Sequence, residues 1–130
     1  MSEFSKQIFS RWRPAENIDT KLYIEKLCED STGLHLELAP PGLPHRRLHL
    51  HFDNYLAYRT ANEGDLLKTI GPDMVGATLF IVEHSEFLDW FIDQTLGVRS
   101  ADPIQHYAIY TPDNCVDVLS LTPPNVWWQS

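Results

Sequence analysis

The segment TLFIVEHSEFLDWFIDQTLG, residues 78–97, joins a short strand pattern to a helical pattern. The apolar run at residues 77–82 is rich in β-branched and aromatic side chains and too short for an independent helix, so it predicts a buried strand. Ser85 has the side chain of a helix N-cap, and Gly97 suits the end of a helix. The pattern predicts a helix over residues 85–96, in which Phe87, Leu88, Phe91, Ile92 and Leu96 recur at helical spacing and Trp90 lies on the flank. We expect this helix to anchor the core through Phe87, Leu88 and Phe91.

The opposite face of this predicted helix is acidic. Glu86, Asp89 and Asp93 recur at i, i+3 and i+7, and Glu83 lies just before the helix. We expect these four carboxylates to lie in solvent on one side of the molecule.

Alternation of apolar and polar residues predicts strands in much of the remaining chain. The predicted strands cover residues 21–28, 34–38, 47–52, 55–60, 104–110 and 115–121. Phe4, Ile8, Phe9 and Trp12 have helical spacing, so residues 2–13 are predicted to form a short N-terminal helix, or a tail, that docks through Phe9 and Trp12 and ends at Pro14. Residues 126–128 form a tail in which Trp127 and Trp128 cover an edge of the core.

These elements predict an α+β fold in a single domain, residues 1–130. We expect a mostly antiparallel, bent sheet of about seven strands packed on one main helix (residues 85–96), with a late strand–helix–strand unit and a short N-terminal helix. If the strands at 78–83 and 104–110 are neighbours, a right-handed crossover makes them parallel.

The length and composition favour a cytoplasmic protein. The chain has 130 residues, and it contains neither 18 consecutive apolar residues nor a segment typical of a signal peptide. Cys28 and Cys115 lie far apart in sequence; reduced thiols are expected, although the sequence leaves a disulfide open.

The formal net charge of −8 is concentrated in the second half of the chain. Residues 61–130 carry only Lys68 and Arg99 against ten carboxylates. Such a surface opposes binding to nucleic acid and to anionic membranes, and it favours a basic protein partner. Ordinary solubility is the alternative interpretation.

Histidines are densest around His35, His49 and His51. His49 and His51 stand two apart on a predicted strand, so both imidazoles project from one face, where His35 and Glu37 of the neighbouring strand could add ligands. This arrangement predicts a possible metal site; a solvated polar face is the alternative.

The last predicted hairpin turns at Pro112-Asp113, which aligns Tyr110 with Cys115, Ala108 with Asp117, and His106 with Leu119. A cysteine nucleophile is disfavoured because Cys115 then lies roughly 13 Å from His106. His106 and Asp117 are diagonal neighbours that could pair. The chain has no phosphate-binding glycine loop and no nucleophile elbow, so we predict neither a catalytic residue nor a cofactor.

Three segments carry a family resemblance: YRTANEGD at 58–65, LFIVEHSEFLDWFIDQTLG at 79–97 and IQHYAIYTPDNCVDVLS at 104–120. They are similar to segments of small bacterial proteins that resemble the immunity proteins of polymorphic or contact-dependent toxin systems. The resemblance implies a protein that binds a toxin domain, often a nuclease.

Charge and resemblance together predict a non-enzymatic immunity-type protein that neutralises a basic toxin domain. The predicted partner-binding residues are Glu63, Asp65, Glu83, Glu86, Asp89 and Asp93. One alternative is a metal-binding protein or metal-dependent enzyme that uses His35, His49 and His51. Another is a subunit or scaffold domain held together through Trp127 and Trp128.

Overall fold

The computed structural model describes residues 7–18, 20–62, 70, 74 and 76–129. The described residues form nine strands and one helix. In chain order these are β1 (Ile8–Arg11), β2 (Tyr23–Asp30), β3 (Gly33–Ala39), β4 (Arg47–Phe52), β5 (Tyr55–Asn62), β6 (Leu79–Glu83), α1 (Glu86–Gln94), β7 (Gln105–Tyr110), β8 (Asn114–Ser120) and β9 (Asn125–Gln129).

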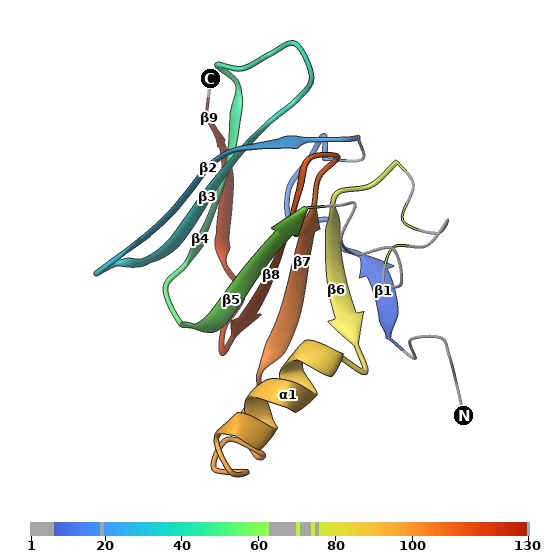
Figure 1. The fold of residues 1–130 in the computed structure, drawn as a ribbon. Helices are drawn as coiled ribbons and strands as arrows, with labels where there is room; N and C mark the ends of the chain where they lie inside the picture. The colour runs from blue at the N-terminus through green and yellow to red at the C-terminus, as the bar shows by residue number, and fades with distance from the viewer. Residues whose placement is uncertain (1–6, 19, 63–69, 71–73, 75, 130) are drawn as a thin grey trace.

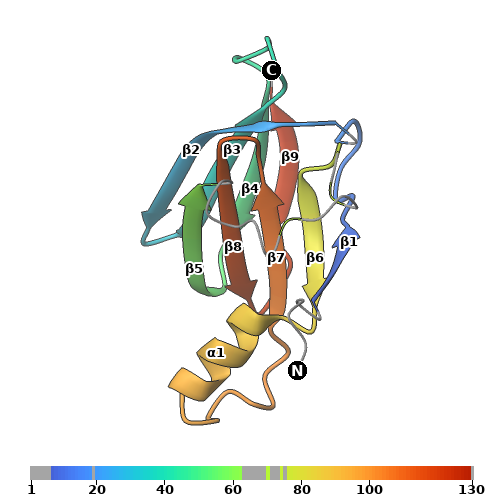
Figure 2. The ribbon, with the colours of Figure 1, turned by 45° about the vertical axis from the view of Figure 1, so that its right-hand side comes forward.

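The strands form two antiparallel sheets that lie against each other (Figures 1 and 2). One sheet has the order β1-β6-β7-β8-β5 and the other the order β2-β3-β4-β9. Strands take up 50% of the described residues and helix 9%. The predicted α+β fold, with one bent sheet packed on a main helix, is therefore wrong. Each sheet covers the apolar face of the other, so no helix is needed to bury either face.

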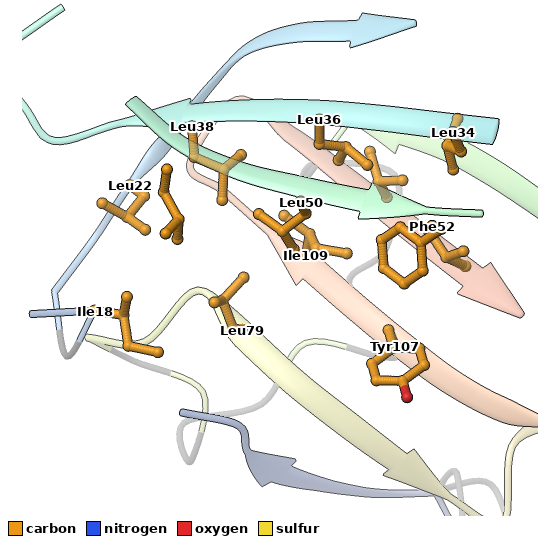
Figure 3. Close-up of a cluster of buried hydrophobic side chains, with 13 residues drawn as sticks. Ile18, Leu22, Leu34, Leu36, Leu38, Leu50, Phe52, Leu79, Tyr107 and Ile109 are labelled. Atoms are coloured by element: carbon orange, nitrogen blue, oxygen red, sulfur yellow. The ribbon is translucent and has the colours of Figure 1, made fainter. Parts of the chain in front are cut away.

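The core lies between the two sheets. Leu36 and Leu50 from the four-stranded sheet meet Leu79, Tyr107 and Ile109 from the five-stranded sheet (Figure 3). Along β3 and β4 every second residue faces this core, and the residues between them are half-buried on the outer face, apart from buried Gly33 and Ala39 at the two ends of β3. The predicted alternation in these strands is therefore confirmed.

The five-stranded sheet is covered on its outer face as well. Phe80, Ala108 and Tyr110 belong to a second buried cluster, against which Phe9 and Ile70 pack. This second layer explains why β7 and β8 are buried almost continuously instead of alternating.

The first hairpin agrees with the sequence prediction. β2 pairs with β3 through a turn in which Asp30 Oδ1 accepts hydrogen bonds from the backbone N–H and the hydroxyl of Thr32. Gly33 follows with φ +130°, and a Cβ there would lie 2.3 Å from the carbonyl oxygen of Phe52. Only glycine allows the two chain segments to approach this closely.

Residues 55–60 form a strand as predicted, but this strand leaves the sheet that contains β4. β5 instead pairs with β8, with Tyr58 opposite Val118. The chain thus changes sheet at the Asp53-Asn54 turn, which alternation alone cannot reveal.

The N-terminal segment forms a strand and not the predicted helix. β1 pairs with β6, which places Phe9 opposite Val82. Residues 8–11 gain their backbone hydrogen bonds from a strand some seventy positions away, and this outweighs the local helical spacing. Residues 2–6 of the predicted helix lie outside the described residues.

The strands on either side of the helix are neighbours, but they are antiparallel. Leu79 faces Ile109 and Val82 faces His106. The predicted parallel crossover is therefore wrong, and α1 projects from one end of the five-stranded sheet (Figures 1 and 2). No helix in the described part of the chain has the length and apolarity needed to cross a membrane.

The C-terminal tail is also a strand. β9 pairs with β4, with Trp128 opposite Leu48 and Trp127 opposite His49. The two tryptophans therefore point to opposite faces. Trp128 packs on the core as expected, whereas Trp127 lies on the outer face of the sheet and is 43% exposed.

Candidate functional site

The acidic residues predicted to bind a partner gather around α1. Glu83, Glu86, Asp89 and Asp93 are all exposed. Of the predicted set, Glu63 and Asp65 lie outside the described residues.

These four carboxylates are not neutralised by the described residues. None of the ion pairs formed within that part of the chain involves them. Glu86 and Asp89 lie in the first turn of α1, where the helix dipole favours negative charge, but the last turn holds Asp93 and no basic residue. The four carboxylates are therefore exposed to solvent without an ion-pair partner among the described residues.

Apolar side chains are exposed beside the charges. Trp90 is 55% exposed on α1, and Leu96 just after the helix is 93% exposed. Leu96 was expected on the apolar face of a helix over residues 85–96; this is wrong, because the helix ends at Gln94 and Leu96 takes a left-handed conformation with φ +55°. Phe87 is the only fully buried residue of α1, so Leu88 and Phe91 anchor the core less than predicted.

A hollow of about 340 Å³ adjoins the helix. Its lining is mainly apolar and comes from β5 and α1, namely Ala57, Tyr58, Arg59, Phe87 and Trp90. We call the exposed surface formed by this hollow, Trp90 and the four carboxylates the α1 surface.

A buried polar network fixes α1 to the sheet. Ser85 is the N-cap, and its Oγ accepts a hydrogen bond from the backbone N–H of Leu88 at 2.9 Å. The same Oγ lies 2.6 Å from Nδ1 of His106, and Nε2 of His106 lies 2.7 Å from Oδ1 of Asp117. Nε2–H of His106 donates to the carboxylate, so both ring nitrogens of His106 and the hydroxyl of Ser85 have hydrogen-bond partners.

The Asp117 carboxylate accepts hydrogen bonds from two further side chains. The Tyr110 hydroxyl donates to both carboxylate oxygens, at 2.9 and 3.1 Å, and Arg59 Nε donates at 3.0 Å. Burial by itself raises the pKa of Asp117, but the hydrogen bonds and charges of His106 and Arg59 outweigh it, so the pKa lies below its ordinary value. Burial, followed by the negative charge of Asp117, raises the pKa of Tyr110.

The network ends at the α1 surface. The Arg59 guanidinium lies 4.3 Å from the centroid of the Phe87 ring, and Phe87 stacks on Trp90 with centroids 6.0 Å apart. Phe87 also meets the His106 ring edge-to-face at 5.7 Å. The position of the exposed Trp90 is therefore coupled through Phe87 to the buried residues.

The order Ser85, His106, Asp117 has the residue types of a hydrolytic triad, but the burial points to a structural role. All three residues are at most 4% exposed, and Ser85 Oγ already caps the helix. The predicted contact between His106 and Asp117 is confirmed, as is the strand register that aligns Tyr110 with Cys115. No disulfide bond joins Cys28 to Cys115.

The histidines of the predicted metal site separate into two stacks. His35 and His51 stack on each other with ring centroids 4.1 Å apart, and both bind Thr32, the first through its hydroxyl and the second through its carbonyl. His49 stacks instead on Trp127, at 4.9 Å. Within the described residues, no three His, Cys, Asp or Glu side chains form a group that could hold a metal ion.

The sequence indicates the acidic face and the N-cap, but it does not indicate that Arg59 and Trp90 belong to the α1 surface. Trp90 lay at the flank of the helical pattern, and its exposure depends on how α1 leaves the sheet. Arg59 gives only a weak signal in the sequence, because it is a single basic residue within a predicted strand. Its partner Asp117 is 58 positions away, beyond the reach of local patterns.

Comparison of this chain with models of known protein families, with curated proteins and with solved structures gives no match. Functional inference therefore depends on the geometry of the α1 surface and on the sequence resemblance.

Proposed function

We propose that this chain is an immunity-type binding protein, which neutralises a basic bacterial toxin domain by docking the α1 surface onto it. The observation that carries the proposal is the combination, on and just before one projecting helix, of the exposed Trp90 with four carboxylates that form no ion pair with the described residues. The toxin setting, a nuclease domain included, and a cytoplasmic location come from the sequence resemblance and composition.

The two components of the surface support different parts of binding. Carboxylates at the rim of an interface attract a basic partner and raise the association rate. A tryptophan that is held in place but largely exposed is typical of the residues that dominate binding energy and slow dissociation. Trp90 is held in this way, because its ring stacks on Phe87, and Phe87 is in turn in contact with the Arg59 guanidinium.

The charge arrangement on α1 works against the stability of the free helix. Asp89 and Asp93 are like charges at i, i+4, which destabilises a helix by about 0.2–0.5 kcal/mol. Asp93 also lies near the negative end of the helix dipole. A surface that opposes local stability in this way is typical of a functional site.

The experiment uses the immobilised chain to retain a protein from a lysate of the source bacterium. Three chains are compared: the wild type, Asp89→Lys/Asp93→Lys, and the control Glu16→Lys/Glu25→Lys. The control replaces two exposed carboxylates away from α1 and changes the net charge equally. We expect a basic protein that the wild type and the control retain and the α1 variant loses.

Binding and toxicity are then measured with that protein. Asp89→Lys/Asp93→Lys should lower the association rate at least tenfold at low salt, whereas Trp90→Ala should mainly raise the dissociation rate. Expression of the retained protein should arrest growth unless the wild-type chain is present. The proposal fails if the retained protein is acidic, if the control and the α1 variant behave alike, or if growth is unaffected.

A further inference from the structure

The two sheets leave four end strands, which differ in how well their edges are protected. β2 carries Glu25, Lys26, Glu29 and Asp30 and has a bulge between Ile24 and Lys26. Charges and bulges of this kind prevent a sheet edge from pairing with another chain.

The edges of the five-stranded sheet are also protected. β5 carries Arg59 and has a bulge between Tyr55 and Ala57. β1 has only four residues, the last of them Arg11. Short length, positive charge and bulges each oppose the addition of a further strand.

β9 lacks the charges and the bulges that protect the other end strands. Its sequence NVWWQ contains no charge and no proline, and its pairing with β4 is regular over all five residues. Within the described residues, β4 is the only strand that pairs with β9, and no other backbone hydrogen bond involves it. Alternate residues of β9, including Trp127, are exposed.

The strand is nevertheless held in an extended form that suits pairing. Trp128 packs on the core and donates its indole N–H to the carbonyl oxygen of Glu16 at 2.7 Å. Trp127 stacks on His49 with an interplanar angle of 3°. Because both tryptophans are already ordered, β9 would lose little conformational entropy on gaining a partner strand.

The sequence of β9 is matched to itself. When two copies pair antiparallel about Trp127, Trp127 faces Trp127 of the second copy, Val126 faces Trp128, and Asn125 faces Gln129. Every pair is apolar with apolar or amide with amide, and no like charges meet. On the outer face, the ring stack of His49 and Trp127 would continue into the same stack of the second copy.

We propose that β9 is a self-association edge, through which two copies of this chain join their four-stranded sheets into one eight-stranded sheet. A five-residue strand gives a small interface, so the dimer is weak and depends on concentration. α1 belongs to the other layer and projects from its end, so dimerisation leaves the α1 surface free (Figure 1).

Analytical ultracentrifugation of the full chain over a range of concentrations tests the proposal. The wild type should shift from the 15.0 kDa monomer toward twice that mass as concentration rises. The decisive comparison is between Asn125→Lys/Gln129→Lys and Asn125→Lys/Gln129→Glu. In the predicted register the first variant sets lysine against lysine, and the second sets lysine against glutamate.

We expect the lysine–lysine variant to remain monomeric and the lysine–glutamate variant to dimerise at least as well as the wild type. Ile8→Lys is the matched control, because Ile8 lies on an end strand of the other sheet and its exposed fraction of 48% is similar to the 43% of Trp127. The Ile8→Lys chain should dimerise as the wild type does. Thermal unfolding of each variant verifies folding, since Gln129 faces Arg47 within the chain.

Three results would overturn the proposal. The wild type could stay monomeric at the highest concentration, which would leave the β9 edge unpaired. Both double variants could dimerise alike, which would place the interface elsewhere. Ile8→Lys could abolish the dimer, which would assign it to β1.

Discussion

Replacement of Asp117 by asparagine tests whether the buried network holds α1 in place. The Asp117 carboxylate accepts from three donors, His106 Nε2–H, the Tyr110 hydroxyl and Arg59 Nε–H. An asparagine amide presents its own N–H group to one of these donors and removes the charge that faces Arg59. The change therefore leaves at least one buried donor unpaired.

The magnitude follows from these losses. A hydrogen bond to a charged group contributes about 1.5–3 kcal/mol, and an unpaired buried donor costs about 1–3 kcal/mol. Arg59 is 46% exposed and can turn to water, so its share is small. We expect Asp117→Asn to lower the free energy of unfolding by about 3 kcal/mol, equivalent to a fall in Tm of about 10 °C.

Urea unfolding followed by tryptophan fluorescence measures the change, and its pH dependence tests the cause. The pKa of Asp117 in the folded protein lies below the ordinary value of 3.8, so its contribution is complete above pH 3.8 and is lost as pH falls through the folded pKa. The difference in the free energy of unfolding between the wild type and the variant should become smaller below pH 3.8. A loss under 0.5 kcal/mol at neutral pH, or a gap independent of pH, would refute the reasoning.

Two further substitutions test the backbone. Gly33→Ala should lower the free energy of unfolding by at least about 2 kcal/mol, because the alanine Cβ would lie 2.3 Å from the Phe52 carbonyl oxygen at a φ of +130°. Chemical denaturation measures this loss, and an unchanged midpoint would contradict the prediction. Leu96→Asn should raise the free energy of unfolding by about 0.5 kcal/mol, because asparagine tolerates the left-handed conformation at φ +55° better than leucine does. A lower Tm for this variant would count against the explanation.

Much of the strand content could be predicted, because alternation is a local property. Leu48, Leu50 and Phe52 face the core as their spacing indicates, and the Pro112-Asp113 turn fixes how β7 pairs with β8. Alternation tells which residues point inward but not which sheet a strand joins. The division into two sheets therefore could not be read from the sequence.

The errors at the two ends of the chain have the same physical origin. The helical spacing around Phe9 is a local pattern, and the hydrogen bonds that β1 forms with β6 outweigh it. Trp127 and Trp128 gave no strand pattern of their own, and β9 forms because β4 offers it a complete edge. Long-range hydrogen bonding decided both segments.

The candidate site was predictable in its charges but not in its geometry. The acidic spacing of Glu86, Asp89 and Asp93 was visible, and so was the capping role of Ser85. The contact of Ser85 with His106 spans 21 positions and depends on how β6 pairs with β7. No local pattern contains that information.

The central claim is that the α1 surface binds a basic protein. The most direct measurement is the association rate of the retained partner with the wild type and with Asp89→Lys/Asp93→Lys, at low and at high salt. We predict a wild-type rate that falls steeply with salt and a variant rate at least tenfold lower at low salt, with both converging at high salt. Equal rates for the two chains, or a wild-type rate independent of salt, would contradict the claim.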